Sequence, residues 1–127
     1  MLKRPPVIAV VDDEESVRKA LGRLIRAAGF SVETFSSGSD FLLSIHQRLP
    51  HCVVLDLRMP HVNGFQVQQA LAQAGTQLPI VIITGDDSAE SRVRSLEQGA
   101  KAYLRKPVDD AMLLDAIQTA IRPSALR

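Results

Sequence analysis

Short apolar runs alternate with helix-like segments along the whole chain, and this alternation constrains the fold more than any other feature. Residues 7–11, 52–55 and 79–83 are continuous apolar runs dominated by Val and Ile, the pattern of strands buried on both faces of a parallel sheet. Residues 32–35, which include Glu33 and Thr34, and residues 102–104 are predicted as two shorter strands. We therefore expect five strands.

Five segments have apolar residues at helical spacing, and one follows each predicted strand. These predicted helices cover residues 17–28, 39–49, 64–74, 88–98 and 109–121. Strict alternation of strands and helices indicates an α/β domain, a parallel sheet covered on both faces and joined by right-handed crossovers. The periodicity does not determine the order of the strands.

The composition narrows the class of protein further. A chain of 127 residues fits one domain, here residues 1–122, with residues 123–127 as the start of a linker or tail. Its 15 basic and 14 acidic residues nearly cancel, so we expect no direct nucleic-acid binding. One cysteine, Cys52, no long apolar run and a short polar N-terminus favour a cytoplasmic protein without membrane contact.

Polar residues follow four of the predicted strands at their carboxyl ends, where open α/β sheets bind ligands. They are Asp12, Asp13, Asp56, Thr84 and Lys106. Each has a plain structural explanation when it is taken alone. The acidic pair suits a helix start, Asp56 a turn, Thr84 a strand end and Lys106 the surface.

Their joint placement favours a cation site. Two unit charges about 4 Å apart near a protein surface repel by about 4 kcal/mol, so three carboxylates at one edge need compensation beyond Lys106. Mg²⁺ suits a few carboxylates with water and phosphate oxygens. The acidic loop after the first strand argues against a nucleotide site, since neither glycine-rich phosphate motif occurs. The three histidines lack zinc-type spacing with Cys52, and we expect them at the surface.

The complete set of motifs resembles the receiver domains of two-component response regulators, and in particular their FixJ-like branch. The resemblance covers residues 7–121. It rests on Asp12-Asp13, Asp56 with Met59-Pro60 and Gly64 beyond it, Thr84-Gly85, and Lys106-Pro107. It implies a doubly wound, flavodoxin-like sheet with strand order 2-1-3-4-5.

The resemblance also implies roles at the site. Asp56 corresponds to the phospho-acceptor, Asp13 to a direct Mg²⁺ ligand, and Asp12 to a ligand acting chiefly through water. The residue two positions after the acceptor gives a backbone carbonyl to the metal. Here it is Arg58, where many relatives have Asn, and its side chain is expected to affect phosphoryl lifetime through water access.

In this family a phosphoryl group on the acceptor changes the conformation of the domain, and further positions of this chain correspond to residues that take part in that change. Lys106 is expected to pair with the phosphoryl oxygens and Thr84 to hydrogen-bond one of them. Tyr103 matches the aromatic switch position, although an ordinary edge-strand aromatic would also fit. On phosphorylation Thr84 is expected to move inward and the Tyr103 ring to fill the vacated space. The resemblance, and the sharp exit of the chain from the last strand, predict a cis bond between Lys106 and Pro107.

The implied activity is phosphoryl acceptance from a sensor histidine kinase or phosphotransfer protein. The chain is then no enzyme beyond catalysing its own phosphorylation and dephosphorylation. We expect control of transcription through a DNA-binding domain absent from this chain, and phosphorylation-promoted homodimerisation through a face that carries Arg92, Tyr103 and Met112.

Four alternatives are weaker. A stand-alone receiver would act by protein–protein contact alone, and a degenerate receiver would lack the acceptor, the acids or the lysine. A phosphatase with an aspartate nucleophile would carry a second Asp where this chain has Arg58. A flavodoxin-like electron carrier is disfavoured by the acidic first loop and by the absence of Trp.

Overall fold

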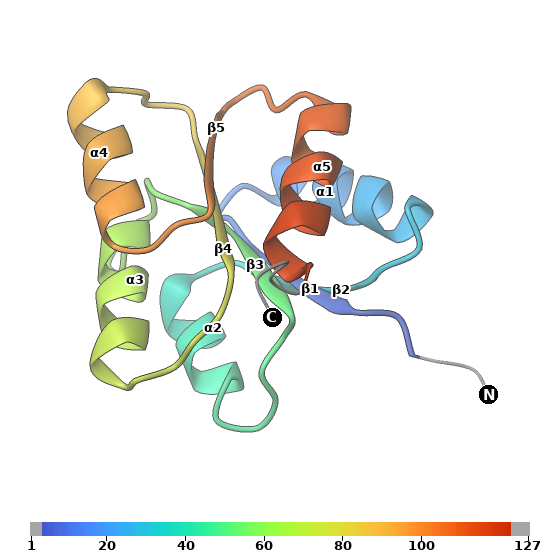
Figure 1. The fold of residues 1–127 in the computed structure, drawn as a ribbon, viewed down its shortest axis with the longest axis horizontal. Helices are drawn as coiled ribbons and strands as arrows, with labels where there is room; N and C mark the ends of the chain where they lie inside the picture. The colour runs from blue at the N-terminus through green and yellow to red at the C-terminus, as the bar shows by residue number, and fades with distance from the viewer. Residues whose placement is uncertain (1–3, 123–127) are drawn as a thin grey trace.

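A computed structural model describes residues 4–122 as five parallel strands and five helices in strict alternation (Figure 1). The strand order is β2-β1-β3-β4-β5, which confirms the order implied by the resemblance. The strands are β1 (Val7–Val11), β2 (Ser31–Phe35), β3 (Cys52–Asp56), β4 (Ile80–Thr84) and β5 (Ala102–Arg105). The helices are α1 (Glu15–Ala27), α2 (Gly38–Ser44), α3 (Gly64–Gln73), α4 (Ala89–Glu97) and α5 (Asp110–Ile121).

The helices cover both faces of the sheet and divide the core into two clusters. On one face α1 and α5 pack against the strands, and on the other lie α2, α3 and α4 (Figure 1). Side chains alternate along β1, since Ile8 and Val10 enter the α1–α5 cluster and Ala9 and Val11 enter the opposite one. A central strand therefore needs apolar residues at every position, which explains the continuous runs in the sequence.

Helix α2 is shorter than predicted. It ends at Ser44 and does not continue to Leu49, so the prediction of a helix over residues 39–49 was wrong at its C-terminal end. A proline at position 50 disfavours helical backbone in the residue before it. The chain tightens before that point, where His46 N–H donates to the carbonyl of Leu43 at 3.3 Å and Gln47 N–H to that of Ser44 at 3.1 Å.

The loop after β3 turns tightly back onto its own strand. Gly64, the first residue of α3, donates its N–H to the carbonyl of Leu57 at 3.0 Å. A Cβ added to Gly64 would lie 2.7 Å from the carbonyl oxygen of Asp56 and 2.8 Å from the Cα of Leu57. A glycine is required here because the helix start lies against the end of the strand that carries Asp56.

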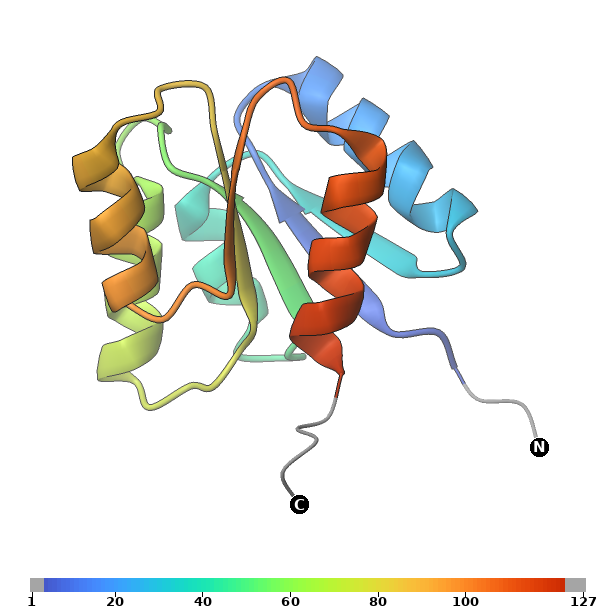
Figure 2. The same cartoon turned by 45° about the horizontal axis from the view of Figure 1, so that its top comes forward.

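The chain leaves β5 through a cis peptide bond between Lys106 and Pro107, which confirms the sequence-based prediction. The loops after β4 and β5 rise over the same edge of the sheet (Figure 2). Within residues 4–122 no helix is both long and apolar enough to cross a membrane. The predicted linker start at residues 123–127 lies outside the described residues.

Candidate phosphorylation site at the carboxyl edge of the sheet

Three carboxylates meet at the carboxyl edge of the sheet. Asp12 and Asp13 follow β1, and Asp56 is the last residue of the neighbouring strand β3. One oxygen from each of the three carboxylates lies within 4.8 Å of the others. Asp12 and Asp56 are buried, at 0% and 2% exposed, whereas Asp13 is exposed. The structure thus brings together the acidic residues that the strand-end pattern had placed at one edge.

Lys106 lies between two of these carboxylates. Its Nζ is 2.8 Å from Oδ2 of Asp12 and 3.6 Å from Oδ1 of Asp56, and it also lies 3.5 Å from Oε1 of Glu14. Burial by itself would lower the pKa of Lys106, but the hydrogen bond to Asp12 and the nearby carboxylates raise it above the ordinary lysine value. The side chain therefore remains an ammonium group at neutral pH.

The electrostatics around Asp56 leave its negative charge undercompensated. Burial raises the pKa of Asp56 from 3.8 to about 6, with repulsion from Asp12 adding to the rise and attraction to Lys106 opposing it. The backbone N–H of Arg58 donates to Oδ1 of Asp56 at 3.3 Å. One cation cannot balance a cluster of this density, so a further cation would lower the free energy of the ionised site.

Asp12 is held in place by its own loop and by α1. Its Oδ1 accepts the N–H of Glu14 at 2.9 Å, and its carbonyl oxygen accepts Nη1 of Arg18 at 2.8 Å. Sequence analysis did not identify Glu14 or Arg18 as site residues. Their only signal was proximity to the acidic pair, since Arg18 lies in the helical turn that follows it.

The Arg58 side chain pairs with a residue outside the carboxylate cluster. Its Nη2 forms an ion pair with Oδ2 of Asp86 at 2.8 Å. This pair joins the loop after β3, which follows Asp56, to the loop after the neighbouring strand β4. Asp86 is the third residue that sequence analysis missed, because no local pattern marks a contact between two separate loops.

Thr84 ends β4 beside the acceptor strand. Asp56 pairs with Ile83 in the register of β3 and β4, so Thr84 lies one residue further toward the carboxyl edge. The Thr84 side chain is buried, accepts the N–H of Asp86 at 3.1 Å and donates to its carbonyl at 3.4 Å. In this conformation the hydroxyl is therefore engaged by its own loop.

The Tyr103 ring lies in the core. Only 6% of the residue is exposed, within the cluster on the α2–α4 face. The guanidinium carbon of Arg92 lies 5.3 Å from the ring centroid. Burial raises the pKa of the Tyr103 phenol, and the Asp87 carboxylate raises it further. Of the three residues expected on the dimerisation face, Arg92 and Met112 are exposed, whereas Tyr103 is buried.

The remaining candidates of the sequence analysis are placed outside the site. His46, His51 and His61 are all exposed, which confirms their assignment to the surface. Cys52 is buried, and burial raises the pKa of its thiol to about 12. A thiol in this state is a poor nucleophile and metal ligand.

The donor set of the edge fits a hard divalent cation. Asp12, Asp13 and Asp56 offer carboxylate oxygens within 4.8 Å of one another, and exposed Asp13 opens the cluster to solvent on one side. Mg²⁺ binds to one or two carboxylates and retains several waters. Among residues 4–122, no histidine or cysteine that would favour a softer metal joins the cluster.

Residues 8–118 match the family model of the response regulator receiver domain. The chain belongs to this family, and it is a receiver domain of two-component systems. The match covers the buried residues of both core clusters and the polar residues of the carboxyl edge.

Curated relatives agree with this assignment. The chain is 38% identical over 122 residues to response regulator protein TodT of Pseudomonas putida, covering 96% of this chain and 54% of TodT. It is 40% identical over 114 residues to transcriptional regulatory protein TdiR of Thauera aromatica, covering 90% of this chain and 50% of TdiR. The chain thus spans about half the length of the curated relatives it matches.

Solved structures show the same fold. Response regulator StyR is 43% identical with a TM-score of 0.83, and the match covers 92% of this chain and 59% of that one. FixJ-N is 31% identical with a TM-score of 0.86, and the match covers 99% of this chain and 100% of that one.

Proposed function

We propose that this receiver domain accepts a phosphoryl group on Asp56 in a Mg²⁺-dependent reaction. The observation that carries the proposal is the position of Asp56. It is a buried carboxylate with a raised pKa, 3.6 Å from the Lys106 ammonium and grouped with two further carboxylates. Asp56 is the one member of this cluster that ends a central strand.

In the reaction an Asp56 carboxylate oxygen attacks the phosphorus atom of a phosphohistidine. The new O–P bond forms as the P–N bond breaks, and the imidazole leaves with the bonding electron pair. Lys106, already between Asp12 and Asp56, is in reach of the oxygens of the transferred group. Bound Mg²⁺, held by Asp13, Asp56, the Arg58 carbonyl and, through water, Asp12, would neutralise charge that develops on those oxygens.

The switch uses Thr84. Its hydroxyl is bonded to Asp86 in the described conformation, and a phosphoryl group on Asp56 offers a charged acceptor in its place. Charge-assisted hydrogen bonds are stronger than neutral ones, so Thr84 turns toward the phosphoryl group and the loop before α4 follows. The Tyr103 ring, already buried in the core, then packs into the space that the Thr84 hydroxyl leaves. The phosphoryl group thereby biases a two-state equilibrium.

The phosphoryl donor is a sensor histidine kinase or a phosphotransfer protein, the partners with which receiver domains of two-component systems work. We infer that the output is control of transcription, because TdiR is named a transcriptional regulatory protein and is about twice as long as the matched region. Action as a stand-alone receiver by protein–protein contact is the second candidate. We place the protein in the cytoplasm, which is compatible with both transcriptional control and action as a stand-alone receiver.

Labelling with acetyl phosphate and Mg²⁺ tests this proposal. A receiver gains one acid-labile phosphoryl group per chain and catalyses only its own phosphorylation and slow dephosphorylation. A phosphatase with an aspartate nucleophile would release inorganic phosphate continuously and show little stable label. Sustained turnover without a labelled chain would therefore replace our proposal by the enzyme alternative.

A further inference from the structure

The interface between α3 and α4 buries polar atoms that lack partners. Gln68 on α3 is only 1% exposed, and its Nε2 donates to the carbonyl of Ser95 on α4 at 3.0 Å. Its Oε1 and the hydroxyl of Ser95, which is 0% exposed, have no hydrogen-bond partner among the described residues. Since a carbonyl can only accept, the bond to Ser95 identifies the free atom of the amide as its oxygen. Two buried acceptors or donors left unsatisfied raise the free energy of this arrangement.

Helix α4 buries few apolar side chains that could offset the cost of these unpartnered atoms. The buried side chains of the helix are Ser91 and Ser95, whereas its larger apolar residues, Val93 and Leu96, are 53% and 43% exposed. By contrast α3 buries Phe65, Val67 and Leu71. Helix α4 is therefore seated by small polar residues where the neighbouring helix uses large apolar ones.

Two arginine side chains of α4 also contact aromatic rings of β5 and α3. The guanidinium carbon of Arg94 lies 4.0 Å from the ring centroid of Phe65, and that of Arg92 lies 5.3 Å from that of Tyr103. Both arginines are exposed, and cation–π contacts at exposed sites are weak. They can re-form after a small movement of the helix because the arginine stems are long and flexible.

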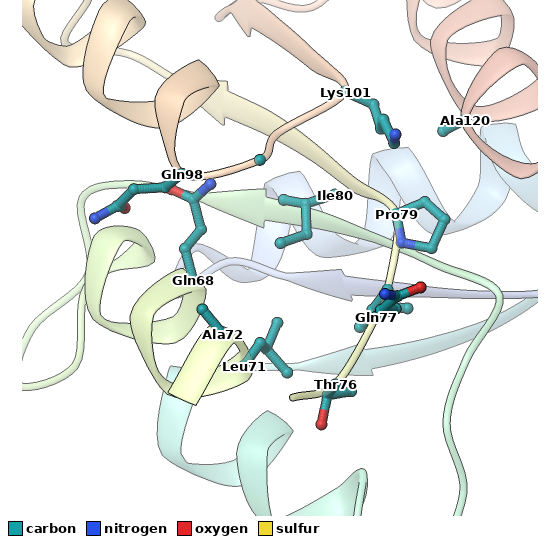
Figure 3. Close-up of a pocket in the computed structure, with 12 residues that line it drawn as sticks. Gln68, Leu71, Ala72, Thr76, Gln77, Pro79, Ile80, Gln98, Lys101 and Ala120 are labelled. Atoms are coloured by element: carbon teal, nitrogen blue, oxygen red, sulfur yellow. The ribbon is translucent and has the colours of Figure 1, made fainter. Parts of the chain in front are cut away.

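A groove opens beside Gln68 at the amino edge of the sheet. It has a volume of about 610 Å³ and includes Gln68 and Leu71 of α3, Ile80 of β4, and Gln98 at the end of α4. Figure 3 shows Gln68 reaching from α3 toward the end of α4 at one side of this groove. A small outward movement of α4 would therefore let water from the groove solvate the two unpartnered atoms.

We propose that Gln68 and Ser95 are positioning residues that make the seated position of α4 costly. They thereby set the equilibrium between seated and displaced α4. Helix α4 begins at Ala89, directly after the loop that follows Thr84 and carries Asp86. The equilibrium therefore also determines how readily a phosphoryl group on Asp56 shifts the helix, and this coupling rests on the function proposed above.

Three single variants test the proposal. Ser95→Ala removes an unpartnered hydroxyl, and Gln68→Met removes the unpartnered amide oxygen at similar volume. The Ser95 carbonyl also accepts the N–H of Ala100 at 3.1 Å, so Gln68→Met does not leave it without a partner. Ser91→Ala is the matched control, because it makes the same change of helix propensity in α4 at a serine whose hydroxyl is not among the unpartnered atoms.

Amide hydrogen exchange of the unphosphorylated protein gives the first readout. We expect α4 amides to exchange faster than those of α3 and α5 in the wild type. Ser95→Ala and Gln68→Met should slow α4 exchange about five- to tenfold beyond Ser91→Ala, a range that corresponds to about 1–1.4 kcal/mol. Exchange of α4 only through global unfolding, or variants that match the control, would overturn the proposal.

Affinity for beryllofluoride with Mg²⁺, a mimic of the phosphoryl group, gives the second readout. Because the proposal has the phosphoryl group favour displaced α4, the two variants should bind the mimic more weakly by a similar factor. A merely structural role would change unfolding by urea and leave this affinity unaltered, and that result would also overturn the coupling. If the wild type does not bind the mimic at all, the proposed function fails, whereas the exchange experiment still decides the role of Gln68 and Ser95.

Discussion

Arg58 in the loop after β3 and Asp86 in the loop after β4 form an ion pair, with Nη2 and Oδ2 2.8 Å apart. The pair connects the loop that adjoins the acceptor with the loop that engages Thr84. Both side chains are more than half exposed, at 59% and 64%, so the pair should contribute less than about 1 kcal/mol to stability. Its position suggests a role in access of water to Asp56.

We predict that Arg58→Ala shortens the lifetime of the phosphorylated protein several-fold while leaving unfolding by urea nearly unchanged. Asp86→Ala should act in the same direction, and the double variant should resemble either single one, as expected for residues that act through one contact. Arg48→Ala, which removes the remote ion pair with Glu33, is the control. Decay of phosphate label measures the lifetime, and an unaltered lifetime in both single variants would exclude a role in water access.

Mg²⁺ should bind weakly, and Asp13→Ala should remove most of the binding. Asp13 is the exposed member of the carboxylate cluster, so its substitution removes the ligand that we expect to contact the metal directly and leaves no cavity in the core. Glu15→Ala is the control, because Glu15 is an exposed neighbouring acid that pairs with Lys19. Titration followed by NMR shifts of the loop after β1 measures the affinity. Equal affinity in Asp13→Ala and wild type would move the metal site elsewhere.

The raised pKa of Asp56 predicts a specific pH dependence of stability. With a folded pKa of about 6 against an ordinary value of 3.8, the folded state binds more protons between these values. The stabilising contribution of protonated Asp56 is fully present below about pH 4 and is lost as the pH rises through 6. Asp56→Asn should therefore raise the free energy of unfolding at pH 7 by up to about 3 kcal/mol, with no gain below about pH 4.

Urea denaturation without Mg²⁺ at both pH values measures this difference. Asp115→Asn on α5, an exposed acid remote from the site, should show no comparable gain at pH 7. A gain that persisted unchanged at low pH would mean that the asparagine stabilises the fold for reasons other than the charge of Asp56.

The carboxyl edge was predictable because β1, β3 and β4 are continuous apolar runs that stop at a polar residue. Asp56 and Thr84 were located in this way, since β3 and β4 are buried at every position. The end of α2 was misplaced because its apolar pattern continues toward a proline that the backbone cannot accommodate in a helix. The strand order came from the family resemblance and not from periodicity.

Contacts between separate elements were beyond sequence reasoning. The pair Arg58–Asp86 depends on the conformations of two loops, and the bond from Gln68 to Ser95 depends on which faces of α3 and α4 meet. Tyr103 was predicted at a functional position, but its burial depends on how the edge strand β5 packs beneath α4. None of these relationships has a local signature in the chain.

Phosphorylation is predicted to promote homodimerisation through the surface of α4 and α5. Val93 and Leu96 on α4 and Met112 on α5 are large apolar residues at 53%, 43% and 59% exposure. Met112→Glu should keep the beryllofluoride-bound protein monomeric in sedimentation. Leu43→Glu on α2, where Leu43 is 68% exposed, introduces the same charge on another helix and should not. A monomeric wild type at high concentration in both states would argue against the dimer.

The identity of the phospho-acceptor is the central claim, and intact-mass measurement after treatment with acetyl phosphate and Mg²⁺ tests it most directly. We predict that the wild type gains the mass of one phosphoryl group and that Asp56→Asn gains none, because Asp56 alone combines burial, a raised pKa and contact with Lys106 at the end of a central strand. Full labelling of Asp56→Asn at Asp12 or Asp13 would contradict the account.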